Sequence, residues 1–179
     1  MRRSRRIFRI LLLLVGLTLG FVACFGSVPL QAAEPKTGTW SGGGAIGFLG
    51  NTPDGTAFAT NLNADYFITP QLSLGPLAQI AATGDLFQFG FSGQAKLWFD
   101  LPDFDKRLKL NLQGGIGFLH SDLFSSDDSW LIPIGVGLDY ALNEKLSLTS
   151  TFLLNFTDVH TGRGTDAHIM PGLTFGIRF

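Results

Sequence analysis

The chain has 179 residues, enough for one domain, and a single cysteine, Cys24, which excludes an intrachain disulfide. It is 45% hydrophobic and only 15% charged, with 17 Phe and 23 Gly, a composition that excludes an intrinsically disordered chain. The formal net charge of −1 argues against a nucleic-acid-binding protein, which needs a basic surface.

The first 33 residues have the layout of a secretory signal peptide. Five arginines open the segment, an apolar run follows at 10–22, and Gln31-Ala32-Ala33 supplies small residues before a cleavage point. The run is shorter than the ~20 residues of a membrane-spanning helix, which disfavours an uncleaved anchor. The segment 21–24 resembles a lipobox, so lipidation of Cys24 remains an alternative. We expect export by the general secretory route and cleavage after Ala33.

Cleavage at that point would alter the charge of the remaining domain, residues 34–179. Loss of the five arginines leaves eight basic residues against 14 acidic ones, a net charge of about −6. This charge again disfavours nucleic acid as a partner, and the loss of Cys24 leaves no thiolate ligand for a metal.

From residue 38 to residue 179, apolar and polar residues alternate with a period of two, which is typical of strands. Three weaker segments, at about 39–50, 55–68 and 72–82, precede a clear one at 86–99. Four more follow, at about 108–118, 130–140, 146–157 and 169–179. The links contain Gly, Pro, Asn and Asp, as turns require. We therefore predict an all-β fold, an eight-stranded antiparallel up-and-down barrel.

The apolar face of these strands is predicted to point outward, into lipid. An eight-stranded barrel has an interior only just wide enough for side chains. The many Phe and Leu residues of this face would overfill the interior, whereas the Gly, Ser, Thr, Asn and Gln of the other face fit it. The barrel is therefore predicted to be transmembrane.

Aromatic residues on the apolar face gather near the two ends of the strands. If both chain termini lie at the periplasmic end, one girdle comprises Trp40, Tyr66, Phe99, Tyr140 and Phe179. The other comprises Phe48, Phe58, Phe87, Phe118, Trp130 and Phe156. Ten residues separate Trp130 from Tyr140, which spans about 25 Å in a tilted strand, the height of a lipid-facing band.

Five charged residues alternate with the apolar face near the periplasmic end, and we expect them inside the barrel. They are Asp65, Lys96, Lys109, Asp139 and Arg178. Because buried charge is tolerated only when it is paired, we predict an ionic cluster that plugs the lumen. The alternative is that these side chains extend to the rim of the barrel.

The final segment, Leu173-Thr174-Phe175-Gly176-Ile177-Arg178-Phe179, resembles the last strand of small outer-membrane β-barrel proteins, the group of OmpX-like and OmpA-type barrels. The stretch 65–75 also resembles the hairpins of this group. The resemblance covers the chain after residue 33 and implies an outer-membrane location. It further implies that Phe179 ends a signal for the outer-membrane assembly machinery. It implies no particular activity.

Three functions follow as hypotheses, and we favour a structural or surface-interaction role through the links predicted at 50–55, 83–85, 120–129 and 158–167. The alternatives are a lipid-modifying enzyme, for which His120, Ser121 and Asp122 have suitable chemistry, and a narrow pore. Adjacent strand residues alternate in direction, which disfavours the enzyme. We expect no cofactor and no metal, because the three histidines lack ligand spacing. Membrane lipid is the expected partner of a monomer.

Overall fold

A computed structural model describes residues 36–101, 105, 107–162 and 166–179; the predicted signal peptide, with Cys24, lies outside these ranges. Among the described residues, no helix is long and apolar enough to cross a membrane. The strands are β1 (Trp40–Thr52), β2 (Gly55–Thr69), β3 (Leu72–Ala82), β4 (Phe87–Asp100), β5 (Leu108–Asp122), β6 (Ser126–Asn143), β7 (Leu146–His160) and β8 (Asp166–Arg178).

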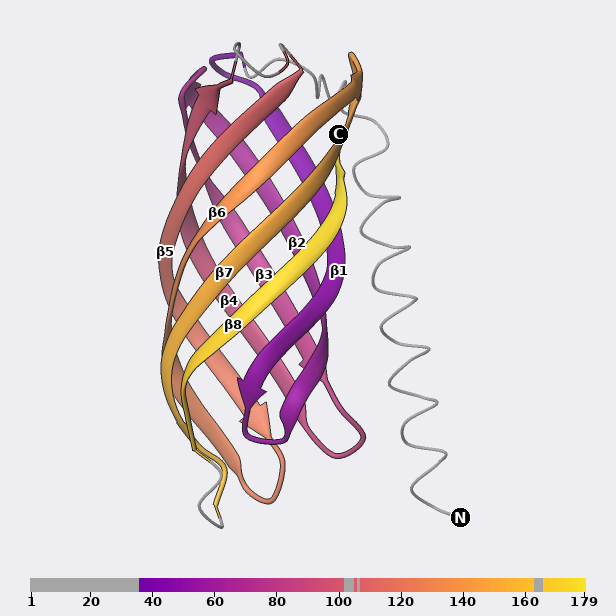
Figure 1. The fold of residues 1–179 in the computed structure, drawn as a ribbon. Coiled ribbons are helices and arrows are strands. Elements are labelled where there is room, and N and C mark those ends of the chain that lie inside the picture. The colour runs from indigo at the N-terminus through magenta and orange to yellow at the C-terminus, as the bar shows by residue number, and fades with distance from the viewer. Residues whose placement is uncertain (1–35, 102–104, 106, 163–165) are drawn as a thin grey trace.

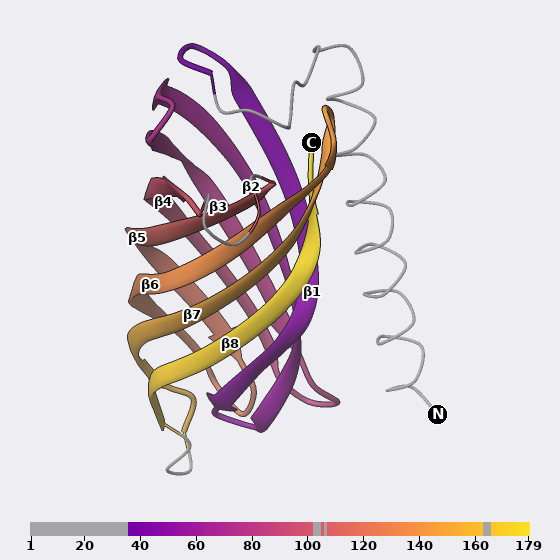
Figure 2. The ribbon, with the colours of Figure 1, turned by 45° about the horizontal axis from the view of Figure 1, so that its top comes forward.

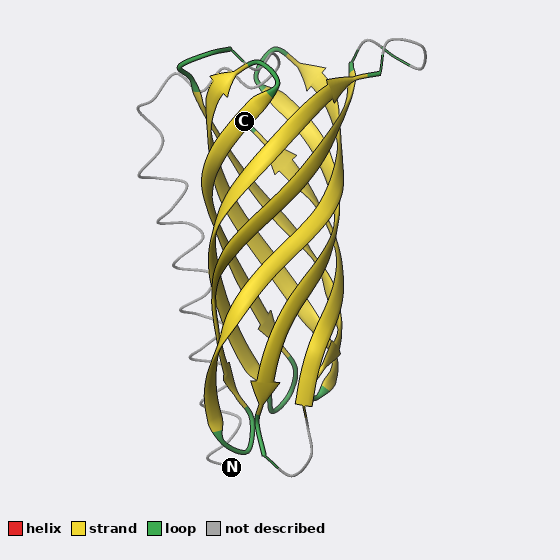
Figure 3. Ribbon diagram, turned by 90° about the vertical axis from the view of Figure 1, so that its left-hand side faces the viewer, coloured by secondary structure: helices red, strands yellow, loops and turns green. Residues whose placement is uncertain are grey.

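The eight strands form one closed antiparallel barrel in which consecutive strands are neighbours. Strands β1 and β8 complete the wall by pairing from Gly43↔Arg178 to Leu49↔Gly172. Figures 1 and 3 show strongly tilted strands that wind around a single axis, and Figure 2 shows the same wall with its top tilted forward. The predicted all-β, eight-stranded up-and-down barrel is confirmed.

The two ends of the barrel are named here for the chain termini. The terminal end holds Trp40 and Phe179 and lies at the top of Figure 1; the distal end lies opposite. At the distal end, the β5–β6 and β7–β8 hairpins extend further than the β1–β2 hairpin (Figure 1). The two longer hairpins therefore form most of the distal rim.

The apolar face of the alternation points outward. Ile46, Ile134 and Phe175 are 59%, 52% and 58% exposed, whereas Ser92 is fully buried within the lumen. Every strand contributes at least one exposed large hydrophobic side chain, and together these form what we call the apolar belt. Representative members are Ile46, Leu74, Phe91, Leu112, Ile134, Phe152 and Phe175. A soluble protein does not expose a continuous apolar surface of this kind, whereas lipid covers it favourably.

The structure corrects the link boundaries predicted at the distal end. Residues 120–129 and 158–167 were expected as loops, but backbone pairing continues to Asp122↔Ser126 and to His160↔Asp166. The apolar alternation stops where the wall leaves the belt, and the backbone ladder does not depend on it. The β5–β6 turn is consequently only residues 123–125.

Three prolines lie within strands, and each coincides with a gap in a ladder because proline has no backbone N–H to donate. At Pro133, the β5–β6 pairing skips from Gly114↔Ile134 to Gly117↔Leu131. Beside Pro76, the β2–β3 pairing is interrupted, and the β1–β8 pairing ends at Gly172, next to Pro171. The barrel wall is thus locally weakened at three places without losing closure.

Candidate functional site: the lumen and the distal rim

The terminal half of the lumen holds two buried ion pairs. Lys96 Nζ lies 2.9 Å from Asp65 Oδ2, and Arg178 Nε lies 2.5 Å from Asp139 Oδ2. Asn63 donates to Asp65, and Asn111 donates to Asp139, so both carboxylates accept further hydrogen bonds. These four charged residues, with Asn63 and Asn111, are called the ionic network. Charges buried this deeply are tolerated because they are paired and hydrogen-bonded.

Trp98 lies beside the ionic network and limits the lumen toward the terminal end. Its Nε1 donates to Ser73 Oγ at 2.9 Å, and the guanidinium of Arg178 lies 5.1 Å from its ring centroid. Phe67 packs against the other side, with ring centroids 5.6 Å apart. An indole whose N–H is satisfied and whose face contacts a cation is a stable way to close a polar interior.

Lys109 is the predicted member that the structure places outside the ionic network. Its ammonium pairs with Asp100 across the β4–β5 ladder, and the Asp100 side chain is 70% exposed. Lys109 lies opposite Asp139 in the β5–β6 register. However, Arg178 and Asn111 already occupy the oxygens of Asp139. Lys109 consequently belongs to the terminal rim, the alternative that the sequence had left open.

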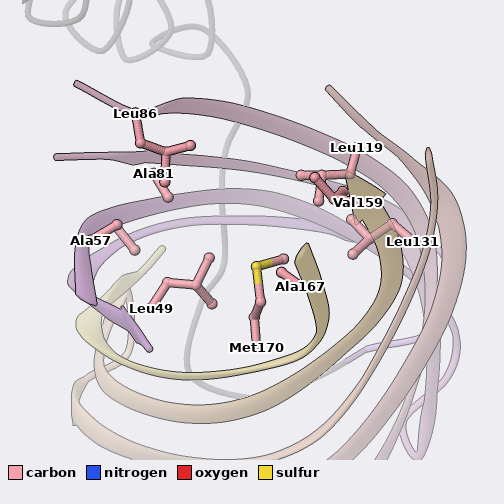
Figure 4. Close-up of a cluster of buried hydrophobic side chains, with 10 residues drawn as sticks. Leu49, Ala57, Ala81, Leu86, Leu119, Leu131, Val159, Ala167 and Met170 are labelled. Atoms are coloured by element: carbon pink, nitrogen blue, oxygen red, sulfur yellow. The ribbon is translucent and has the colours of Figure 1, made fainter. Parts of the chain in front are cut away.

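Apolar side chains occupy the distal half of the lumen, where the alternation predicted polar ones. They are Leu49, Ala57, Ala59, Ala81, Leu86, Leu119, Leu131, Val159, Ala167 and Met170, and they are called the distal cluster. Figure 4 shows them converging from around the wall, with the sulfur of Met170 near the centre. A signal in the sequence could have found them: next to an outward aromatic stands a second apolar residue, as in Phe48-Leu49, Phe118-Leu119 and Trp130-Leu131.

Two inward glycines make room for these contents of the lumen. A Cβ at Gly137 would lie 2.5 Å from the side-chain nitrogen of Asn111, and a Cβ at Gly90 would lie 2.9 Å from Leu131 Cδ2. No real Cβ tolerates such distances, so each glycine vacates the space that a neighbouring side chain fills.

Among the described residues, the free space beside the ionic network is small. A lumen cavity of about 40 Å³ lies among residues of the ionic network, lined in part by Lys96, Asn111, Asp139 and Arg178. A recess of about 420 Å³ lies at the terminal end, lined by Lys36, Gln71, Asp100 and Lys109 among others. Trp98 is the residue that both lining sets share.

The residues predicted as aromatic girdles lie on the outer surface near the two ends. At the terminal end, the rings of Trp40 and Tyr66 are 5.2 Å apart, and the guanidinium of Arg107 lies 4.8 Å from the ring centroid of Tyr140. At the distal end, Phe48 and Phe58 form an edge-to-face pair at 6.4 Å. Remaining members are Phe87, Phe99, Phe118, Trp130, Phe156 and Phe179, all exposed or half-buried.

The terminal link beside Tyr140 contains two charged groups whose pKa values are shifted. A backbone hydrogen bond from Arg107, reinforced by its guanidinium, lowers the pKa of Asp105 below its usual value. The same pair raises the pKa of Arg107. Both groups lie outside the strands, and the pair fixes the turn that precedes β5.

The distal rim is acidic. Within the described residues it contains no Lys or Arg, but three histidines and seven aspartates: Asp54, Asp85, Asp122, Asp127, Asp128, Asp158 and Asp166. Asp158 Oδ1 lies 3.0 Å from His168 Nδ1, and the rings of His160 and His168 are 6.0 Å apart. This proximity was not predictable from residue spacing, because it depends on the β7–β8 register. No group of three or more His, Cys, Asp or Glu in the described ranges is arranged to hold a metal ion.

The structure separates the three residues considered for acyl transfer. His120 pairs with Asp128 at 2.7 Å on the rim. Ser121 faces the lumen, where it accepts a hydrogen bond from Gln88 at 3.2 Å, and Asp122 accepts one from Ser126. A nucleophile and its base must lie within hydrogen-bond reach of each other, and these residues have other partners.

No protein-family model and no curated protein matches the chain. Among solved structures, it is similar to Neisserial surface protein A, with a TM-score of 0.58 and 18% identity over 78% of this chain and 94% of that one. It is also similar to the N-terminal β-barrel domain of Pseudomonas aeruginosa OprF, with a TM-score of 0.55 and 16% identity over 83% and 100%. The chain has the fold of the small outer-membrane β-barrels.

De novo designed transmembrane β-barrels are similar too, with a TM-score of 0.53 and 13% identity over 82% of this chain and 98% of the design. At such identities the similarity establishes the fold and no activity. In an outer-membrane barrel of this kind, a closed wall satisfies every strand edge and an apolar belt faces the lipid. The observed closure and belt meet both requirements and, with the shared fold, locate this protein in the outer membrane.

Proposed function

We propose that this outer-membrane barrel is a closed structural anchor that presents an acidic rim at the cell surface, with neither transport nor catalysis as its main role. The observation that carries the proposal is the filled lumen, in which the cavity among the ionic residues measures only about 40 Å³. One water molecule needs about 10–15 Å³ of such space, so this cavity holds a few waters and leaves no room for a larger solute.

The rim supports an interaction role by its charge. Seven aspartates without a described Lys or Arg produce a negative surface, which favours partners with a basic face and raises their association rate. The rim lies on two extended hairpins of a rigid wall, as binding surfaces often do. In this arrangement the terminal end faces the periplasm and the barrel is a monomer surrounded by lipid. Assembly into the membrane begins with recognition of the strand that ends at Phe179.

The non-conducting part of the proposal is tested by inserting the purified protein into planar lipid bilayers. We expect no ion conductance above that of the bare membrane. Folding is checked by a gel-mobility difference between boiled and unboiled samples. Stable channels from the folded protein would contradict the proposal and favour the narrow pore.

The absence of lipid chemistry is tested separately in cells that express the protein. Mass spectrometry of lipid A should give the same acyl-chain pattern with and without expression. A changed pattern would support the enzyme hypothesis, and it would direct mutagenesis to the rim histidines.

A further inference from the structure

The lumen contains two layers that could block passage, and they differ in chemistry. The ionic network lies in the terminal half, and the distal cluster lies in the distal half. We infer that the distal cluster is the seal that excludes ions and bulk water, and that the terminal half is a hydrated chamber. The inference rests on the proposed function because it requires a barrel whose lumen is blocked, and it names the residues that block the lumen.

The terminal half is built to hold water. Its cavity of about 40 Å³ is large enough for a water molecule, and its lining includes Lys96, Asp139 and Arg178. Asn111 also lines the cavity, and its buried carbonyl oxygen has no hydrogen-bond partner among the described residues. The side-chain carbonyl oxygen of Gln94, on the neighbouring strand β4, is also buried without a hydrogen-bond partner among the described residues. Buried polar atoms of this kind are normally satisfied by ordered water.

Access to the chamber is limited by one side chain. Trp98 lines both the lumen cavity and the 420 Å³ recess at the terminal end. The recess is lined by the charged side chains of Lys36, Asp100 and Lys109 and is therefore wet. We expect water to pass between the two spaces only when the buried Trp98 indole moves away from Ser73 and Arg178.

The distal half offers an ion no comparable environment. Leu49, Leu131 and Met170 reach across the lumen at 7%, 1% and 1% exposure, and the other members of the distal cluster are equally apolar. Uncharged polar side chains also reach this region, among them Gln88, Ser121 and Asn155, and the side-chain carbonyl oxygens of Gln88 and Asn155 have no hydrogen-bond partner among the described residues. Gln88 donates to Ser121 Oγ and lies 3.8 Å from the Met170 sulfur. An apolar constriction expels water and so blocks ions without any charge, whereas charged and amide groups can replace an ion's hydration shell.

Planar-bilayer conductance of three double variants tests the inference. Leu131→Ala/Met170→Ala removes the seal, and Asp139→Asn/Arg178→Gln neutralises one of the two ion pairs of the ionic network. Ile134→Ala/Leu138→Ala is the matched control on the lipid-facing side of β6. We expect the seal variant to conduct about tenfold or more above wild type, because the constriction then admits water. The ionic and control variants should stay at the wild-type level.

A polar variant of similar side-chain shape guards against collapse of the emptied space. Leu131→Asn/Met170→Gln fills more of the space than the alanine pair does and makes the constriction polar, so it should also conduct. Each variant is first shown to fold by its gel-mobility shift. Conductance above wild type from the ionic variant, or no increase in conductance from either seal variant, would overturn the inference. Conductance from wild type would instead overturn the proposed function, so the two failures are distinguishable.

Hydration can be read directly from the wild-type protein by NMR in lipid nanodiscs. The side-chain amides of Asn111 and Gln94 should show cross-peaks to water, and the methyl group of Met170 should show none. Water contact at Met170 in the wild-type barrel would also overturn the inference.

Discussion

The two faces of the barrel wall follow different rules. The outer face is apolar on every strand, and each of its side chains meets lipid, which adapts to any apolar shape. The inner face meets only other side chains of the same chain, so each position depends on what lies across the lumen. The carboxylate of Asp139 is paired with Arg178, and the side chain of Leu131 fills the space beside Gly90. The same alternation therefore encodes an outer surface that tolerates substitution and an inner surface whose side chains must fit one another.

The largest loss of stability is expected where a charged residue inside the barrel loses its partner. Asp139→Leu leaves the buried Arg178 guanidinium without its carboxylate and should lower the free energy of unfolding by about 3–5 kcal/mol. The double variant Asp139→Leu/Arg178→Leu should lose clearly less, because no charge is stranded. Urea unfolding in lipid vesicles, followed by tryptophan fluorescence, measures both. Equal losses would show that pairing does not govern this part of the lumen.

Truncation in the distal cluster should come next. Leu131→Ala, at 1% exposure, leaves a cavity that lipid chains cannot reach and should cost about 2–5 kcal/mol. Leu112→Ala, at 47% exposure in the apolar belt, should cost clearly less, since lipid chains occupy the vacated space. The same unfolding measurement compares them. A belt variant as unstable as the lumen variant would remove the proposed difference between the two faces.

The outer face should tolerate size changes but not charge. Ile134 lies on β6 midway between the aromatic residues Trp130 and Tyr140, so Ile134→Arg should cost about 2–4 kcal/mol, as arginine does near a bilayer midplane. Leu142→Arg, close to the terminal end of the same strand, should cost about 0–1 kcal/mol. Unfolding in vesicles again gives both numbers. A cost that does not depend on depth would contradict a membrane-spanning belt.

The smallest effect is expected at the distal rim. His168 and Asp158 pair at 3.0 Å, but their side chains are 65% and 50% exposed. Asp158→Asn should therefore change the free energy of unfolding by at most about 1 kcal/mol. The difference should vanish in high salt, which screens exposed pairs. A loss that persists in salt would indicate that the rim stabilises the β7–β8 hairpin by more than this ion pair.

The outer face was predictable from the sequence because its rule is local. Alternation with period two identified eight strands, and the excess of Phe and Leu over the interior volume decided which face points outward. Strand ends were less predictable. Beyond Leu119 the residues turn polar, and pairing continues to Asp122 because the backbone ladder needs no apolar side chain.

The inner face was predictable only in part, because closure and register decide which residues meet. The sequence placed Asp139 and Arg178 inside, but their pairing depends on β6 and β8 lying two strands apart in the closed wall. Alternation alone does not decide whether Lys109 pairs with Asp139 or with Asp100, and in the structure it pairs with Asp100. The distal cluster was not predicted, because Leu49, Leu119 and Leu131 lie at positions that the alternation assigned to polar residues.

Neighbouring positions on β7 report whether the apolar face of the wall points into lipid. Phe152 is 41% exposed on the outside, and Leu153 is 2% exposed inside the lumen. In a Cys24→Ser background, a spin label attached to a single cysteine at either position is measured by EPR in lipid vesicles. The label at 152 should be relaxed by oxygen, which concentrates in lipid, and not by a water-soluble nickel complex; the label at 153 should be shielded from both reagents. If the label at 152 responded to nickel rather than to oxygen, the apolar belt would face water and the account would be wrong.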